Sequence, residues 1–205
     1  MQGETLTSIE QSGKTDPVTR LIEALQREGF TPLAEDEDWR TYGERVYHRS
    51  EQISFIRGET VFVLIDFPNL DDRILRSAVD GITELFRAKS RRDRAFSVLQ
   101  ATTVYVCIIA RTESPHNDRL TRYLSAVGGS VIIPVVIVPE INQVVYPMTD
   151  EGRIGSIRPR IEYLQYLLGE RRSAVPIHRH TVRTLYAAIS IVGILLLAVL
   201  LAVIT

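Results

Sequence analysis

Lysine is almost absent from this chain of 205 residues, in which Lys14 and Lys89 stand beside 22 arginines. The bias indicates a GC-rich prokaryotic genome, and it restricts any chemistry that depends on lysine. Cysteine is scarcer still, because Cys107 is the single one, which excludes an internal disulfide and a thiolate metal cluster. Since Cys107 lies in the apolar run 104–109, we expect a buried small hydrophobic side chain in a reducing compartment.

An excess of charge of either sign is also missing, since 24 basic residues face 25 acidic ones. A chain with this balance is no polycation of the kind that binds nucleic acid, so nucleic acid is not the partner we expect. The N-terminus has neither a positively charged region nor an apolar stretch, and no secretory signal peptide is predicted. Residues 1–15 are polar, and we expect them to be disordered.

One long hydrophobic run stands out near the C-terminus. Residues 185–204 carry no charge, and thirteen of these twenty residues are Leu, Ile or Val. Twenty helical residues span about 30 Å, the thickness of the hydrocarbon core of a bilayer, and insertion would be favoured by about 4–8 kcal/mol. We therefore predict a transmembrane helix. Ala198 and Ala202 form a pair of small residues four apart, which leaves open a homo-oligomer through this helix.

The flanks of this segment predict its orientation. A basic linker, residues 170–184, precedes the segment and only Thr205 follows it. The arginines of this linker are Arg171, Arg172, Arg179 and Arg183. Because basic flanks stay in the cytoplasm, we expect a single-pass, tail-anchored protein of the cell membrane, with its N-terminal domain on the cytoplasmic side.

The part before the linker, residues 16–169, predicts one α/β domain. Asp16 and Pro17 fit the start of a first helix, and Gly29 fits its end. Three strand-like runs follow, at 44–49, 52–57 and 60–66. Their breaks at Ser50-Glu51 and Gly58-Glu59 are typical of antiparallel hairpins.

The second half of the domain alternates between helical and strand patterns. The ranges are a helix over 71–89, a strand over 102–110, a helix from 115 to the stop at Gly128-Gly129, a strand over 131–138 paired with 143–146, and a helix over 159–168. Helical connections between buried strands indicate parallel neighbours. We therefore predict a single three-layer domain with a mixed sheet, in which an antiparallel meander leads into a βαβαβ unit.

The order helix, three strands, helix, strand is also the core order of the restriction-endonuclease-like nucleases. Those nucleases resemble one another through an acidic residue in the second strand and an acid-x-lysine pattern in the third. The third run here offers Glu59-Thr60-Val61, without the lysine. An active nuclease is therefore not expected, although an inactive relative of that fold stays open.

Three aspartates, Asp66, Asp71 and Asp72, surround the end of the third strand-like run. Open α/β sheets bind ligands at this end of their strands, and these carboxylates are candidate ligands for Mg²⁺. The alternative is structural, with Asp71 or Asp72 capping the next helix and Asp66 stabilising the turn. We favour the structural alternative and expect neither a metal nor another cofactor.

The densest group of charges lies near the end of the second helix. Its basic residues are Arg87, Lys89, Arg91, Arg92 and Arg94. They complement the helix dipole, or they form a surface for lipid headgroups or an acidic partner.

No catalytic set of residues emerges from the sequence. We therefore expect a non-enzymatic binding or scaffolding module that meets a protein partner at the membrane. The alternative is a membrane-tethered enzyme or small-ligand sensor, with a strand-end pocket near Asp66 and Ala110.

Overall fold

The structure is a computed structural model, and it describes residues 16–33, 45–53, 56–92, 100–111, 117–127, 130–147 and 157–172. The predicted disordered residues 1–15, most of the linker and the predicted membrane helix 185–204 lie outside these ranges. Within the described ranges, no helix is both long and apolar enough to cross a membrane.

The meander at the start of the sheet has three strands, but not the three that we predicted. It consists of β1 (Thr31–Pro32), β2 (Arg45–Ile53) and β3 (Ile56–Asp66), which pair antiparallel in this order. The expected breaks are wrong, because Ser50 lies opposite Glu59, and Glu51 lies opposite Gly58, inside one continuous ladder. These residues occupy paired positions of the two strands, and Gly58 and Glu59 are buried, so their composition does not mark a turn.

Two helical crossovers extend the sheet, as the sequence predicted. The helix α3 (Asp72–Arg92) connects β3 to β4 (Gln100–Ile109), and β4 is followed in the sheet by β6 (Ser130–Val138). The neighbours β3 and β4, and likewise β4 and β6, run parallel. All nine residues of β6 are buried, as expected of a strand covered on both faces.

The predicted helix from 115 to Gly128-Gly129 is wrong in its second half. In the structure α4 (Asn117–Thr121) is short, and Ser125–Val127 form the strand β5. This strand pairs antiparallel with the first residues of β6. The spacing of Leu120, Tyr123 and Leu124 suits a helix, but the available partner strand overrides this local preference.

The outer edge of β6 is shared by two short strands. The strand β5 covers the first residues of β6, up to Ile132, and β7 (Gln143–Val145) covers its end, from Val136 onward. The 3₁₀ turn η2 (Pro139–Ile141) connects β6 to β7. Pro134 lies in the gap between β5 and β7, where a proline, which has no backbone N–H, interrupts no ladder on that edge.

The remaining two helices confirm their predicted ends. In α1 (Pro17–Arg27), Asp16 accepts a hydrogen bond from the backbone N–H of Thr19 at 3.1 Å. Gly29 follows it with a φ of 78°, a conformation that glycine adopts without strain. The helix α5 (Arg158–Leu167) covers the predicted range 159–168 to within one residue.

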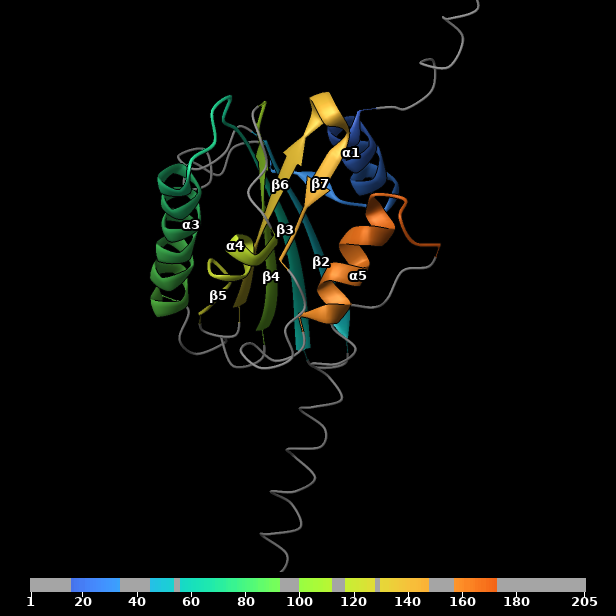
Figure 1. The fold of residues 1–205 in the computed structure, drawn as a ribbon. Helices are drawn as coiled ribbons and strands as arrows, with labels where there is room; N and C mark the ends of the chain where they lie inside the picture. Colours follow the sequence, from blue (N-terminus) through green and yellow to red (C-terminus); the bar gives the residue numbers. More distant parts are fainter. Residues whose placement is uncertain are drawn as a thin grey trace, which may run out of the picture.

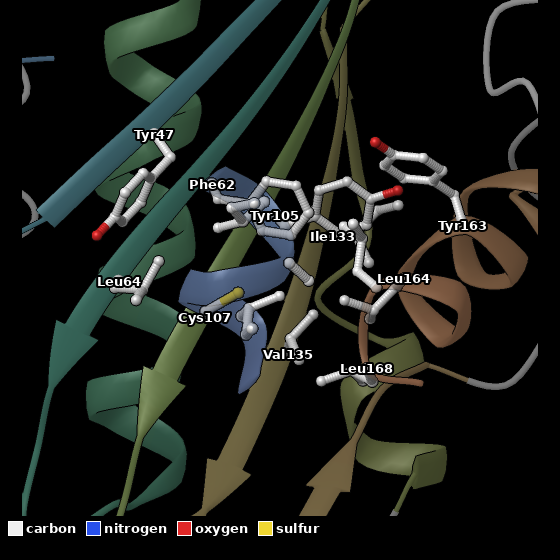
Figure 2. Packing of buried hydrophobic residues seen from close by; sticks show 14 of the residues in the cluster. Tyr47, Phe62, Leu64, Tyr105, Cys107, Ile133, Val135, Tyr163, Leu164 and Leu168 are labelled. Atoms are coloured by element: carbon white, nitrogen blue, oxygen red, sulfur yellow. The ribbon is translucent and has the colours of Figure 1, made fainter. Parts of the chain in front are cut away.

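The sheet of seven strands is mixed, and the described helices pack on both of its faces (Figure 1). One core cluster joins α1 and α5 to side chains such as Phe62, Tyr105 and Ile133 (Figure 2). The other cluster joins α3 and α4 to the alternate side chains of the same strands, such as Val63 and Val106. Because both crossovers run from β3 through β4 to β6, right-handed connections place α3 and α4 on one face. We call the two faces the α1/α5 face and the α3 face.

Candidate functional site

The three strand-end aspartates contact three different partners. Asp71 accepts a hydrogen bond from the backbone N–H of Ile74 at 2.7 Å and so caps α3. The carboxylate of Asp66 lies 3.7 Å from the guanidinium of Arg45, with both side chains nearly half exposed. Asp72 lies 3.9 Å from Arg119.

Metal coordination needs several such groups in one place. Among the described residues, no three His, Cys, Asp or Glu side chains are grouped so that they could hold a metal ion. Ala110, at the end of β4, is buried and donates its backbone N–H to the carbonyl of Ile137 at 2.9 Å. The described residues at this end of the sheet are therefore engaged in packing, capping and surface ion pairs.

An open groove of about 820 Å³ lies beside these acids, along one side of α3. Ile65 and Phe67, the two neighbours of Asp66, form part of its apolar floor together with Ile74 and Ala78 of α3. This combination of a concave shape and an apolar floor is typical of binding sites. Sequence reasoning placed a pocket near Asp66, but it did not predict that α3 would supply most of the lining.

Charged side chains of α3 form the rim of the groove. They are Arg73, Arg76, Asp80 and Glu84. Arg76 lies 3.8 Å from Asp80, and both side chains are largely exposed at 75% and 69%. Glu84 forms a close ion pair with Arg87, whereas Arg73 forms no ion pair with any residue of the described ranges. The rim therefore combines weak surface pairs with an uncompensated cation.

A polar cluster on the α1/α5 face was missed by the sequence analysis. Arg49 of β2 donates to the backbone carbonyl of Glu28 at 2.9 Å and forms a close ion pair with Glu51. Its guanidinium lies 4.9 Å from the ring centre of Phe30, a cation–π contact. Tyr166 of α5 donates its hydroxyl to the Glu28 carboxylate at 2.6 Å. These contacts connect α1, β2 and α5, so we assign the cluster to holding the helices on the sheet.

A second buried polar group lies deeper on the same face. Arg160 of α5 is 9% exposed and donates from Nε to the hydroxyl of Thr103 at 3.0 Å. Its backbone carbonyl accepts a hydrogen bond from the hydroxyl of Tyr105 at 2.8 Å. Burial raises the pKa of Tyr105 well above its ordinary value and lowers the pKa of Arg160. Tyr105 therefore remains a protonated donor, which suits a structural hydrogen bond.

The acids of β2 and β3 do not form the pair that a nuclease would need. Val61 and Val63 of β3 pack on the α3 face, so Glu59, in the same alternation, also belongs to that face. Ser50 of β2 lies opposite Glu59, which leaves the next residue, Glu51, on the α1/α5 face. The two carboxylates therefore lie on opposite faces of the sheet and cannot share one metal ion.

The basic residues near the end of α3 are described only in part. Arg87 pairs with Glu84, while Lys89, Arg91 and Arg92 lie on the last turns of the helix, where the structure describes the backbone alone. Arg94 lies outside the described residues.

The basic residues after α5 are likewise described in part. Arg171 lies 2.8 Å from Glu162 of α5, and Arg172 is exposed. Arg179 and Arg183 lie outside the described residues. The helices α3 and α5, which these two basic groups follow, cover opposite faces of the sheet (Figure 1).

No family model, no curated protein and no solved structure matches the chain. We therefore infer function from the contacts of its own residues. Among the described residues, the groove along α3 combines a concave shape, an apolar floor and charges that are weakly paired. The polar groups of the α1/α5 face are buried within the packing between the helices and the sheet.

Proposed function

We propose that this chain is a non-enzymatic binding or scaffolding module, held at the membrane, whose partner docks in the groove along α3. The observation that carries the proposal is the groove itself, with its floor around Phe67 and Ala78 and its rim of exposed charges. Protein-binding surfaces have this composition, an apolar centre with a polar rim. The strand-end acids support the same function, since Asp71 is engaged in a helix cap and Asp66 in an ion pair.

Attachment to the membrane is the second part of the proposal. Residues 185–204 have the length and composition of a membrane span. The arginines that precede them favour a cytoplasmic position for the domain. The basic residues from Arg87 to Arg94 would add contacts to anionic lipid wherever they come within a Debye length, about 8 Å, of the surface.

A second candidate function follows from the position of the groove. Since Ile65 and Phe67 flank Asp66, the groove opens beside the strand end where α/β proteins bind small ligands. A membrane-tethered enzyme or small-ligand sensor would use the same groove. An inactive relative of the restriction-endonuclease-like nucleases is one form of this second candidate. The two candidates differ in what occupies the groove, a protein or a small molecule.

The test is capture of the full chain from membranes washed with high salt and extracted in mild detergent. Protein and small-molecule co-purifiers are both identified by mass spectrometry. A tagged and an untagged chain are co-expressed, and we expect a protein, either another chain or the untagged copy, that is recovered with the parent and lost with Ser77→Trp. The reason is that Ser77 is exposed on the groove and a tryptophan would fill it. The matched control, Glu23→Trp, changes an exposed residue of α1 on the other face and should retain the partner.

Two outcomes would contradict the proposal. Recovery of only a small molecule, lost with Ser77→Trp, would favour the sensor or enzyme. Membrane attachment is tested with a chain that lacks residues 184–205, which should appear in the soluble fraction. If this truncated chain still pellets with salt-washed membranes, the single-anchor proposal is wrong.

A further inference from the structure

The rim charges of the groove are ordered along α3. Arg73 and Arg76 come first, and Asp80 and Glu84 follow one and two turns later. Residues spaced three or four apart lie on one side of a helix, so the stretch that lines the groove is basic in its first half and acidic in its second. Arg87 follows Glu84 on this side and pairs with it, but it does not line the groove. Ser77 lies between the two halves and is exposed.

Such an order of charges is complementary to itself when it is reversed. If a second α3 runs antiparallel to the first, with a two-fold axis between residues 77 and 80, Arg73 of one copy lies opposite Glu84 of the other. Arg76 then lies close to Asp80 of the other copy. A two-fold interface has this property, that each contact occurs twice.

We propose that the occupant of the groove is a second copy of this chain, packed antiparallel through α3. The inference rests on the proposed function, that of a binding groove, and names its partner. The order of charges favours a second copy over other occupants, because the pattern that complements the rim charges of α3 is the reversed pattern of α3 itself.

The present ion pairs do not oppose this arrangement. Arg76 and Asp80 are more than two-thirds exposed, and the pair of Arg87 with Glu84 is 48% and 64% exposed. Exposed pairs of this kind stabilise a helix only weakly. Exchanging them for pairs between two copies therefore costs little. Arg73, which forms no ion pair with any other described residue, gains a partner in Glu84 of the second copy.

The middle of the interface suits close approach. Ser77, Ala78 and Gly81 are small, and all three line the groove. Small residues at a crossing allow two helices to come close enough for extensive contact. The apolar area is modest, so we expect a weak dimer that forms when copies are concentrated, as they would be on a membrane.

The experiment uses the full chain in its native membrane and measures cross-linking at position 77. Ser77→Cys places a thiol beside the two-fold axis, and a short bismaleimide should join two copies. The native Cys107 does not interfere, because it is fully buried and burial raises the pKa of its thiol. Glu23→Cys on α1 is the matched control and should give little dimer.

Charge reversal then tests the antiparallel order. In the Ser77→Cys chain, Arg73→Glu or Glu84→Arg alone places like charges together twice, and the dimer yield should fall by roughly tenfold. When the two single variants are co-expressed, the mixed dimer has a glutamate of one copy opposite an arginine of the other in both contacts. The yield of this mixed dimer should recover. Only a contact between copies is restored in this way.

Each remaining outcome decides against part of the proposal. If Ser77→Cys cross-links another protein but not a second copy, the second-copy inference is wrong and the binding groove stands. If position 77 gives no cross-linked dimer, the second-copy inference is wrong, and the capture experiment with Ser77→Trp still decides the binding groove. If dimers form but charge reversal has no effect, the antiparallel arrangement is wrong.

Discussion

The face of the sheet under α1 and α5 carries buried aromatic rings and a buried arginine, whereas the buried hydrophobic residues under α3 are aliphatic. On the α1/α5 face, the ring of Phe62 stacks on that of Tyr105 (Figure 2), with 4.3 Å between the ring centres. The ring of Phe62 also meets Phe30 edge to face at 5.4 Å. Arg49 and Arg160 add directional contacts to this packing. The buried hydrophobic residues of the α3 face are Val, Ile, Leu and Ala, and its buried polar residues, Glu59, Thr83 and Thr102, accompany them.

This difference indicates that the two faces of the sheet hold their helices in different ways. Hydrogen bonds and stacked rings hold α1 and α5 in one position, because each such contact has a preferred geometry. Apolar contacts hold α3 without such directional preferences, and they leave its charged side beside the groove. The contacts of the α1/α5 face therefore fix the helices on the sheet, and the proposed binding groove lies on the α3 face.

The first prediction tests the difference in packing between the two faces where we expect the largest effect. Phe62→Ala removes a fully buried ring that two other rings contact, and it should lower the free energy of unfolding by about 3–5 kcal/mol. Ile82→Val, a small deletion on the α3 face, should lower it by about 0.5–1.5 kcal/mol. Chemical denaturation in detergent measures both. Equal losses would mean that the aromatic packing adds nothing to the α1/α5 face.

The second prediction concerns the acids next to the groove. Asp71→Ala removes the cap of α3 and should cost about 1 kcal/mol of stability. Asp66→Asn removes only an exposed ion pair, so its effect should be smaller. In both the parent and Asp66→Asn, added Mg²⁺ should leave the melting temperature unchanged. A stabilisation by Mg²⁺ that is present in the parent and lost in Asp66→Asn would establish a metal site and favour the enzyme.

Much of the fold followed from local patterns in the sequence. The helices α1, α3 and α5 have apolar spacing and end signals that depend only on neighbouring residues, and these predictions were confirmed. The buried strands β4 and β6 were likewise confirmed, because long apolar runs predict central strands. Local information was sufficient wherever an element is decided by its own residues.

The errors arose where a distant segment decides the outcome. The polar pairs at Ser50-Glu51 and Gly58-Glu59 have the composition of turns, and only the register of β2 against β3 makes them partners. Residues 125–127 extend a helical pattern, yet they pair with β6.

The polar cluster and the groove were missed for the same reason, because each depends on residues that are distant in the sequence. The cluster around Arg49 joins residues as far apart as Glu28 and Tyr166, and no spacing in the sequence reports such a contact. The one available signal was Arg49 itself, a charged residue two positions after the buried Tyr47 on the same side of a strand. The groove depends on how α3 lies against the end of β3, which is a matter of packing and not of composition.

The last prediction, which has the smallest expected effect, concerns an ion pair at the edge of the α1/α5 face. Glu162 of α5 accepts hydrogen bonds from Arg158 at 3.1 Å and from Arg171 at 2.8 Å. Burial raises the pKa of Glu162, but these two arginines outweigh it, and its pKa is lowered from the ordinary value of 4.5. A carboxyl whose pKa is lower in the folded state stabilises the protein above the unfolded pKa, and this contribution is lost as the pH falls through the folded pKa.

Glu162→Gln removes the titration while it keeps the shape of the side chain. We expect the variant to be less stable than the parent by on the order of 0.5 kcal/mol at pH 7, with the difference shrinking below about pH 4.5. Glu23→Gln, an exposed change on α1, is the control and should show no such trend. Melting curves from pH 3 to 7 measure the effect. A difference that stays constant over this range would mean that the two arginines do not act on Glu162 through its charge, and that the α1/α5 face owes nothing to this ion pair.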